Sequence, residues 1–234
     1  MNYTELLSEA LFIRRYNRFF ADVETASGGL LTLHCPNTGS MKNCLVPRSP
    51  CWYSRSDKPS RKLPGTLEQV TTTFGNRAGI NTALPNKIVR EALSENLIPA
   101  LSDYPLIRSE VPYGDENSRI DLLLTGSQRD CYVEVKSVTL DMGSGLALFP
   151  DAVTSRGCKH LRELMAMAAA GQRAVLFYCV QLSDVDRVSI ASDIDPEYAQ
   201  TLTKAVALGV EVMAWQCLLT PSGVSLLRPL ELIV

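Results

Sequence analysis

Long apolar runs are missing from this sequence. Nowhere do its 234 residues approach the 18 or more consecutive apolar residues of a membrane-spanning helix. The opening MNYTELLSEALFIRRYNRFF lacks the basic, apolar, small-residue order of a secretory signal peptide. With 46% hydrophobic and 21% charged residues, the composition is that of an ordinary globular chain. We therefore expect a cytoplasmic protein without a membrane partner, whose oligomeric state the sequence leaves open.

Paired cysteines and nucleotide-binding motifs are missing as well. The seven cysteines stand at positions 35, 44, 51, 131, 158, 179 and 217 and form no CxxC pair. An odd, scattered set indicates neither a disulfide framework nor a zinc site, and we interpret these residues as small buried thiols. The chain has no P-loop, GxGxxG or GxSxG motif, so nucleotide-dependent and α/β-hydrolase chemistry lose support and no cofactor-binding residues are predicted.

Charge is distributed unevenly along the chain. Residues 1–90 carry 12 Lys and Arg against 6 Asp and Glu, whereas residues 91–234 carry 11 against 19. A basic half joined to an acidic half suggests an electropositive surface for a polyanion, with carboxylates concentrated elsewhere. A solvated surface of uneven charge would give the same counts, so this observation leaves both interpretations open.

Residues 12 to 80 show short strand patterns separated by turns. The segments FFADVET, LLTLHC, NCLV, CWYS and LEQVTTTF follow one another, and no helix-length periodic segment interrupts them. This spacing is typical of a small barrel or sandwich, and a five-stranded barrel suits a unit of this size. We therefore predict a β-barrel domain over residues 1–80.

The pattern changes near residue 81. Helical periodicity begins at Pro85 and again near Ser155, and a third helix begins with Asp195 as N-cap and Pro196 in its first turn. Strand candidates LIRSEVPYG, RIDLLLTG and CYVEVKSVTL lie between the first two helices, and RAVLFYCVQL and VEVMAWQCLL follow the second and third. This order predicts an α/β domain with a mixed sheet over residues 81–234.

Three charged residues stand in strands that otherwise resemble buried ones. Glu134 and Lys136 share one face of a strand, and a hairpin pairing residue 124 with 131 would place Asp121 opposite Glu134. Two carboxylates that close repel each other unless a cation lies between them. Mg²⁺ favours sites with one or two carboxylates, waters and a phosphate. The pattern therefore predicts a metal site at Asp121 and Glu134, with Lys136 beside the phosphate or the attacking water.

Other residues extend this hypothesis, and a simpler alternative stands beside it. Glu91, on the first predicted helix, could add a third carboxylate to the metal site. Lys159 and His160, on the second, could direct phosphate-binding groups toward the sheet. Alternatively, Lys136 neutralises one carboxylate in a structural ion pair, since E-x-K strands are common on exposed sheet faces.

Several longer segments make a family resemblance recognisable. HCPNTGSM, WYSRSD, SEVPYG, SRIDLLL, CYVEVKSVTL, FPDAVTSRGCKHLREL and GQRAVLFY occur in this order and cover nearly the whole chain. Together they resemble the sugar fermentation stimulation protein A family, most closely its enterobacterial-type members. The resemblance implies an α/β protein overall, with an N-terminal OB-like barrel and a PD-(D/E)xK nuclease-like domain with a mixed sheet. It also implies DNA binding without marked sequence preference and a role in regulating sugar (maltose) metabolism genes.

The resemblance carries over to named positions in this sequence. The nuclease-like positions fall on Asp121, Glu134 and Lys136, with Glu91 as the helix carboxylate that some related nucleases use. In the barrel half, basic residues interleaved with aromatic ones are candidates for nucleic-acid contacts. These basic residues are Arg14, Arg15, Arg18, Lys58, Arg61 and Lys62.

Three functions remain open at this point. The first is a non-specific DNA-binding protein, and the second is a nuclease that cleaves DNA or RNA with Mg²⁺ or Mn²⁺. The third is a regulator that acts through a protein partner, which the sequence supports least because it offers no helix-turn-helix. Whether the acidic site turns over a substrate is not settled by the resemblance.

Overall fold

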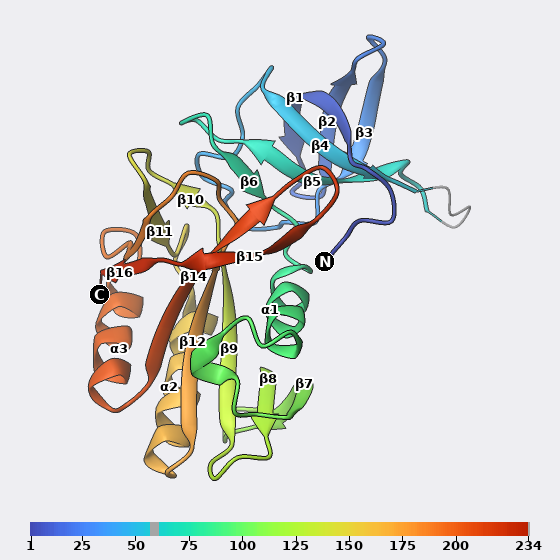
Figure 1. Ribbon diagram of the computed structural model, residues 1–234. Helices are drawn as coiled ribbons and strands as arrows, with labels where there is room; N and C mark the ends of the chain where they lie inside the picture. Colours follow the sequence, from blue (N-terminus) through green and yellow to red (C-terminus); the bar gives the residue numbers. More distant parts are fainter. Residues whose placement is uncertain (57–60, 234) are drawn as a thin grey trace.

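The N-terminal part of the chain is a closed five-stranded barrel. A computed structural model describes residues 1–56 and 61–233, and Figure 1 shows the barrel above a larger α/β domain. Antiparallel pairing runs β3–β2–β1–β4–β5, and a parallel contact between His34 and Thr66 joins β3 to β5. The predicted OB-like barrel is confirmed. Its strands are β1 (Ser8–Tyr16), β2 (Phe20–Thr25), β3 (Leu30–His34), β4 (Pro50–Arg55) and β5 (Gly65–Thr71), and β6 (Arg77–Gly79) extends β5.

Alternation of side chains explains why these segments close into a barrel. Along β2, Ala21 and Val23 point inward and are fully buried, while their neighbours are partly exposed. One predicted strand is wrong, because residues 43–46 form no strand and Asn43 lies in a turn with a positive φ. The sequence pattern also missed β1, whose buried positions Ala10 and Phe12 are followed by a register shift between Phe12 and Arg14.

The second domain is built on a mixed six-stranded sheet. The strand order is β15-β14-β12-β9-β8-β7, with β9, β12 and β14 parallel and the remaining neighbours antiparallel. Helix α1 packs on one face, and α2 and α3 pack on the other (Figure 1). The strands are β7 (Leu106–Tyr113), β8 (Ser118–Thr125), β9 (Cys131–Val138), β12 (Arg173–Val180), β14 (Glu211–Leu219) and β15 (Val224–Pro229).

The three predicted helices are present, with the predicted cap on the third. They are α1 (Pro85–Ser94), α2 (Ser155–Ala169) and α3 (Pro196–Ala207), and a 3-10 turn covers Pro99–Leu101. The Asp195 carboxylate accepts a hydrogen bond from the Tyr198 N–H, as an N-cap should. None of the helices in the described part of the chain is long and apolar enough to span a membrane.

A second, smaller sheet was not predicted from the sequence. Its strands are β10 (Leu140–Asp141), β11 (Leu146–Phe149), β13 (Arg187–Ile190) and β16 (Glu231–Ile233), in the order β10-β11-β13-β16. With two to four residues each, these strands are too short for an alternating pattern to identify them.

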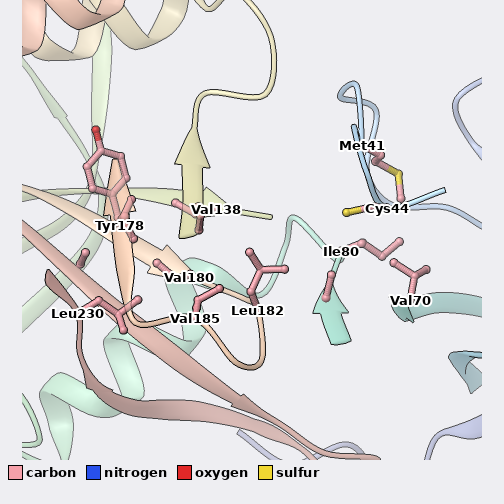
Figure 2. Packing of buried hydrophobic residues seen from close by; sticks show 14 of the residues in the cluster. Met41, Cys44, Val70, Ile80, Val138, Tyr178, Val180, Leu182, Val185 and Leu230 are labelled. Carbon is pink, nitrogen blue, oxygen red and sulfur yellow. The ribbon is translucent and has the colours of Figure 1, made fainter. Parts of the chain in front are cut away.

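The barrel and the α/β domain share one hydrophobic core. Barrel residues Met41 and Ile80 belong to the same buried cluster as Val138 and Leu182 of the second domain (Figure 2). Backbone hydrogen bonds reinforce the contact: the Gly79 N–H donates to the Gln181 carbonyl, and the Ser183 N–H donates to the Arg77 carbonyl. The two domains are therefore packed as one body, which fixes the barrel relative to the sheet.

Residues 1–7 precede the barrel strands and lie against the second domain. The Tyr3 N–H donates to the Ser222 carbonyl, the Leu7 N–H to the Pro221 carbonyl and the Val224 N–H to the Met1 carbonyl. Met1 and Tyr3 also pack on the cluster of buried residues under α1. The chain thus contacts the C-terminal domain before it enters the barrel.

Candidate metal and nucleic-acid site

Strand β8 leaves its hydrogen-bond ladder at Asp121. The hairpin register pairs Leu124 with Cys131 and Leu122 with Val133, which confirms the predicted pairing, and the ladder stops there. One further step of this register would place Asp121 opposite Glu134. On the other side, the β7–β8 pairing also skips Asp121, and Glu110 of β7 has a positive φ of 55°. The carboxylate at this break is held by two donors: the Val135 N–H at 2.8 Å and the Asn86 amide at 2.7 Å.

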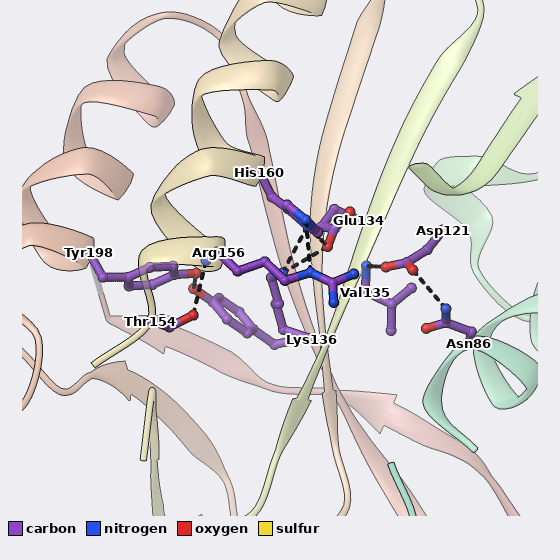
Figure 3. Close-up of polar contacts among 11 residues, drawn as sticks. Asn86, Asp121, Glu134, Val135, Lys136, Thr154, Arg156, His160 and Tyr198 are labelled. Carbon is purple, nitrogen blue, oxygen red and sulfur yellow. Dashed lines mark hydrogen bonds and ion pairs between the residues drawn. The ribbon is translucent and has the colours of Figure 1, made fainter. Parts of the chain in front are cut away.

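Glu134 lies at the centre of a polar cluster on the α2 side of the sheet (Figure 3). It is 2% exposed, and its Oε1 accepts a hydrogen bond from Lys136 Nζ at 2.8 Å and contacts His160 Nδ1. Arg156 donates to His160 Nε2 at 3.2 Å, so the ring proton lies on Nδ1 and points to Glu134. The second oxygen of Glu134, Oε2, is buried and has no hydrogen-bond partner among the described residues.

The two carboxyl groups differ in electrostatic environment. Burial, reinforced by the charge of Glu134, raises the pKa of Asp121 to about 6. Burial also acts to raise the pKa of Glu134, but the His160 hydrogen bond and the charge of Lys136 outweigh it and lower that pKa. Nearby, burial and the charge of Glu134 raise the pKa of Tyr113, whose hydroxyl has no hydrogen-bond partner among the described residues.

These groups suit a hard divalent cation. A buried carboxylate oxygen without a donor, next to a second carboxylate whose charge is unfavourable, is stabilised by a positive ion. Within residues 1–56 and 61–233, no group of three or more His, Cys, Asp or Glu side chains is arranged to hold a metal. Asp121 and Glu134 would therefore supply two carboxylates and leave the other positions to water and phosphate, as Mg²⁺ sites often do.

Glu91 is not brought to this site. Its carboxylate pairs with the amino group of Met1 and is partly exposed, and Asn86 is the α1 residue that reaches Asp121. Five residues of helix turn the direction of a side chain by about 140°, so Asn86 and Glu91 face different ways. The sequence reasoning missed Asn86 and Arg156. Arg156 could have been found, since it precedes His160 by one helical turn.

Comparison with known proteins follows the same two-domain division. A family model described as "SfsA N-terminal OB domain" matches residues 13–80, and one described as "Sugar fermentation stimulation protein RE domain" matches residues 83–223. A sugar fermentation stimulation protein homolog from Pseudomonas fluorescens is 52% identical over 235 residues, covering 100% of this chain and 99% of its own. Homologs from Shewanella baltica and Geobacter metallireducens are 50% and 54% identical, covering 97% and 95% of both chains.

The chain belongs to the sugar fermentation stimulation protein family. A solved structure described as "The structure of Pyrococcus Furiosus SfsA in complex with Ca2+" superposes with a TM-score of 0.86 at 26% identity. The match covers 100% of this chain and 98% of that one, so the family relationship extends over both domains.

The predicted nucleic-acid-binding residues of this family member fall into different environments. Arg14 and Arg18 are exposed on the barrel, although Arg14 also pairs with Asp22 at 2.8 Å. Arg61 and Lys62 are exposed as well. Arg15 differs, because its guanidinium donates to three main-chain carbonyls instead of facing solvent freely. Lys58 lies outside the described residues.

Proposed function

We propose that this member of the sugar fermentation stimulation protein family binds DNA without sequence preference and holds Mg²⁺ or Mn²⁺ at Asp121 and Glu134. The observation that carries the metal site is the buried, unpartnered Oε2 of Glu134 beside a second carboxylate. Support comes from the solved relative described as a complex with Ca²⁺, a cation that also prefers oxygen ligands. The exposed Arg14, Arg18 and Lys62 support phosphate contacts that do not read sequence.

Each residue of the site has a distinct role in this proposal. Asn86 and the Val135 N–H orient the Asp121 carboxylate, and His160 and Lys136 orient Glu134. Lys136 keeps a positive charge beside the carboxylates that a phosphate oxygen can share. A divalent cation bound here would neutralise phosphate charge and make a coordinated water more acidic.

A second candidate function is hydrolysis of DNA or RNA phosphodiester bonds. The observation that favours it is the position of the Lys136 ammonium, 2.8 Å from Glu134 and partly open to solvent at 13% exposure. An ammonium fixed beside a metal-binding carboxylate can stabilise the charge that develops on phosphate during attack by water. DNA binding and nuclease activity are compatible, because the exposed basic residues of the barrel hold phosphates and the Asp121–Glu134 site adds the metal.

The two functions are separated by measuring binding and cleavage in one set of samples. Purified protein is incubated with labelled duplex DNA, single-stranded DNA and RNA of unrelated sequences in Mg²⁺, Mn²⁺, Ca²⁺ or EDTA. Fluorescence anisotropy measures affinity, and denaturing gels measure cleavage. Non-specific binding predicts similar affinities across sequences and a steep fall with salt. Cleavage in Mg²⁺ or Mn²⁺ that Asp121→Asn and Lys136→Met abolish establishes the nuclease, and the absence of DNA binding in every buffer rejects the whole proposal.

The regulatory role in sugar and maltose metabolism genes stays a prediction. Binding without sequence preference does not by itself select a promoter, so such a role requires a second source of specificity. Affinity for duplexes from such promoters, compared with unrelated duplexes of equal length, measures whether this chain supplies it.

A further inference from the structure

The barrel loop, residues 36–43, contacts the segments that adjoin α1, α2 and β9 at the site of Asp121 and Glu134. We infer that this loop forms the barrel-side wall of the site and contacts the sugar–phosphate backbone of the bound nucleic acid. The inference rests on the proposed function, which it deepens by naming a binding surface that includes Thr38 and Lys42. Both residues are exposed.

The first contact is with the chain leading into α1. The Thr82 hydroxyl donates to the Pro36 carbonyl at 2.9 Å. Only four residues later, Asn86 holds the Asp121 carboxylate. Four residues of chain span at most about 14 Å, so the start of the barrel loop lies close to the residue that orients Asp121.

The second contact is with the chain leading into α2. The Met41 N–H donates to an Asp151 carboxylate oxygen at 3.1 Å, and the Ser40 hydroxyl donates to the Asp151 carbonyl at 3.1 Å. Arg156 follows five residues later and donates to His160, which in turn contacts Glu134. The other end of the barrel loop is therefore fixed beside the α2 side of the site.

The third contact is with the chain that leaves β9. The Cys44 thiol, next to the barrel loop, donates to the Thr139 carbonyl at 3.3 Å, and the Asn43 amide donates to the Asp141 carbonyl at 2.8 Å. Thr139 is only three residues beyond Lys136 in the sequence. The barrel loop thus touches the segments adjoining α1, α2 and β9, three of the four elements that supply the site; the fourth, β8, carries Asp121.

The barrel holds this loop in a defined shape from its own side. Arg15 Nη2 donates to the carbonyls of Asn37 and Gly39 at 2.8 and 3.1 Å, and the Asn37 side chain accepts from the Gly39 N–H at 2.8 Å. A Cβ on Gly39 would lie 3.0 Å from Asn37 Oδ1, so the turn is tight. Anchored on both sides, the loop exposes Thr38, Gly39 and Lys42.

The neighbouring turn of the barrel supplies further groups that suit a nucleic acid. The Cys35 N–H donates to the Phe19 carbonyl, so the turn between β1 and β2 lies beside the start of the barrel loop. Arg18 and Phe19 on this turn are exposed, with Phe19 at 49%. A guanidinium for phosphate and an open aromatic ring for a base are the two groups that non-specific binders of single strands combine.

Proximity of bound DNA to the loop is tested with a tethered cleavage reagent. All seven native cysteines are buried, so Thr38→Cys introduces an accessible thiol for an iron–EDTA label. Ser27→Cys is the matched control, because Ser27 is exposed on the turn at the other end of β2. We expect the label on the Thr38→Cys variant to cut bound DNA and the label on the Ser27→Cys variant to leave it largely intact. Wild-type protein treated with the same reagent measures cutting that does not come from a tether.

Affinity provides the second test. Lys42→Glu and Lys204→Glu change the net charge equally, but Lys204 is exposed on α3, away from the barrel. We expect Lys42→Glu to weaken binding of duplex or single-stranded DNA about tenfold, the loss expected for a charge-assisted contact, and Lys204→Glu to change it little. Equal effects of the two variants, or equal cutting from the two labels while the wild type binds DNA, would overturn the loop assignment alone. A wild type that binds no DNA would overturn the assignment together with the proposed function.

Discussion

At the scale of single residues, the two carboxylates of the site play opposite parts when no metal is bound. Asp121 is buried next to another negative charge, which raises its pKa, whereas Glu134 is paired with Lys136 and His160. The unpaired charge opposes folding, and the paired one supports it. The sequence alone offers no means of telling the two carboxylates apart, because the positions of Asp121, Glu134 and Lys136 along the strands do not show that His160 of α2 contacts Glu134.

Asp121→Asn is expected to leave the melting temperature in EDTA unchanged or raised. The new amide oxygen can accept from the Val135 N–H, and its amino group can donate to Asn86 once that side chain flips, so both hydrogen bonds survive. Wild type should gain about 2.7 kcal/mol, or roughly 5–10 °C, at a Mn²⁺ concentration of about 100 Kd. The variant should lose this gain, as measured by scanning calorimetry, while Glu231→Gln on the exposed end of the small sheet should keep it. A full Mn²⁺ gain in Asp121→Asn would exclude Asp121 as a ligand.

Glu134→Gln is expected to destabilise the fold in EDTA. Removal of this carboxylate leaves the Lys136 ammonium and His160 without their shared partner in a site where all three side chains are at most 13% exposed. Breaking a buried pair in this way costs about 3–5 kcal/mol. Urea unfolding of Glu134→Gln beside Lys136→Met measures this cost. The metal hypothesis predicts that Glu134→Gln, which lacks a ligand, does not gain stability from Mn²⁺ as wild type does. A Glu134→Gln variant as stable as wild type would show that the pair contributes nothing to folding.

The arginines of β1 and of the turn that follows it show the same division between binding and structure. Arg14 and Arg18 are exposed, whereas Arg15 holds the barrel loop. Arg14→Ala with Arg18→Ala should lower the slope of log affinity against log salt by up to about two units and leave unfolding unchanged. Arg15→Ala should instead lower the unfolding free energy by about 1–3 kcal/mol, since two loop carbonyls lose their donor. Salt titrations and urea curves on the same preparations distinguish the two effects. If the double variant and Arg15→Ala showed the same salt slope and the same unfolding free energy, this division of roles would be wrong.

At the scale of elements, the start of α2 depends on the start of α3. Asp195 caps α3 through the Tyr198 N–H and also accepts from the Thr154 N–H at 2.7 Å, and Thr154 caps α2. The first two turns of α2 carry Arg156 and His160 (Figure 3). The shared Asp195 carboxylate therefore helps to position one side of the site.

Asp195→Ala is therefore expected to disturb both helices. Loss of a cap costs about 0.5–2 kcal/mol, and the lost bond to Thr154 adds to it, so we expect a loss of about 2–3 kcal/mol in urea unfolding. Asp195→Asn, which keeps one acceptor, should lose less. Equal stability of the alanine variant and wild type would show that the caps act independently of this residue.

The same elements show how far sequence alone reaches. Helices α1 and α3 were predictable because Pro85, Asp195 and Pro196 mark their starts. The β8–β9 register was predictable because a hairpin over residues 125–130 pairs residue 124 with 131. The small sheet was not predictable, since strands of two to four residues are too short to show a period. Asn86 was missed and Glu91 preferred because charge was given more weight than direction around the helix. A pattern that names residue types cannot show which face of α1 meets Asp121.

At the scale of the whole molecule, the continuous core makes the two domains one cooperative unit. Leu182 is fully buried and packs in the cluster that includes Met41 and Ile80 of the barrel. We expect a single calorimetric transition for wild type, with calorimetric and van't Hoff enthalpies equal. Leu182→Ala should lower stability by about 2–5 kcal/mol while the transition stays single, and Leu164→Ala within the second domain provides a comparison. Two separated transitions in wild type would show that the barrel unfolds independently.

The contacts of residues 1–7 also have a consequence for the order in which the molecule is assembled during translation. The Met1 amino group donates to the Val224 carbonyl, 223 positions further along the chain. The barrel strands all lie in the first third of the sequence and can pair as soon as they leave the ribosome. Residues 1–7, by contrast, must wait until residues 221–224 have been synthesised. The segment that is made before the barrel is therefore among the last to reach its place, and a nascent chain released before residues 221–224 are made would leave residues 1–7 without these contacts.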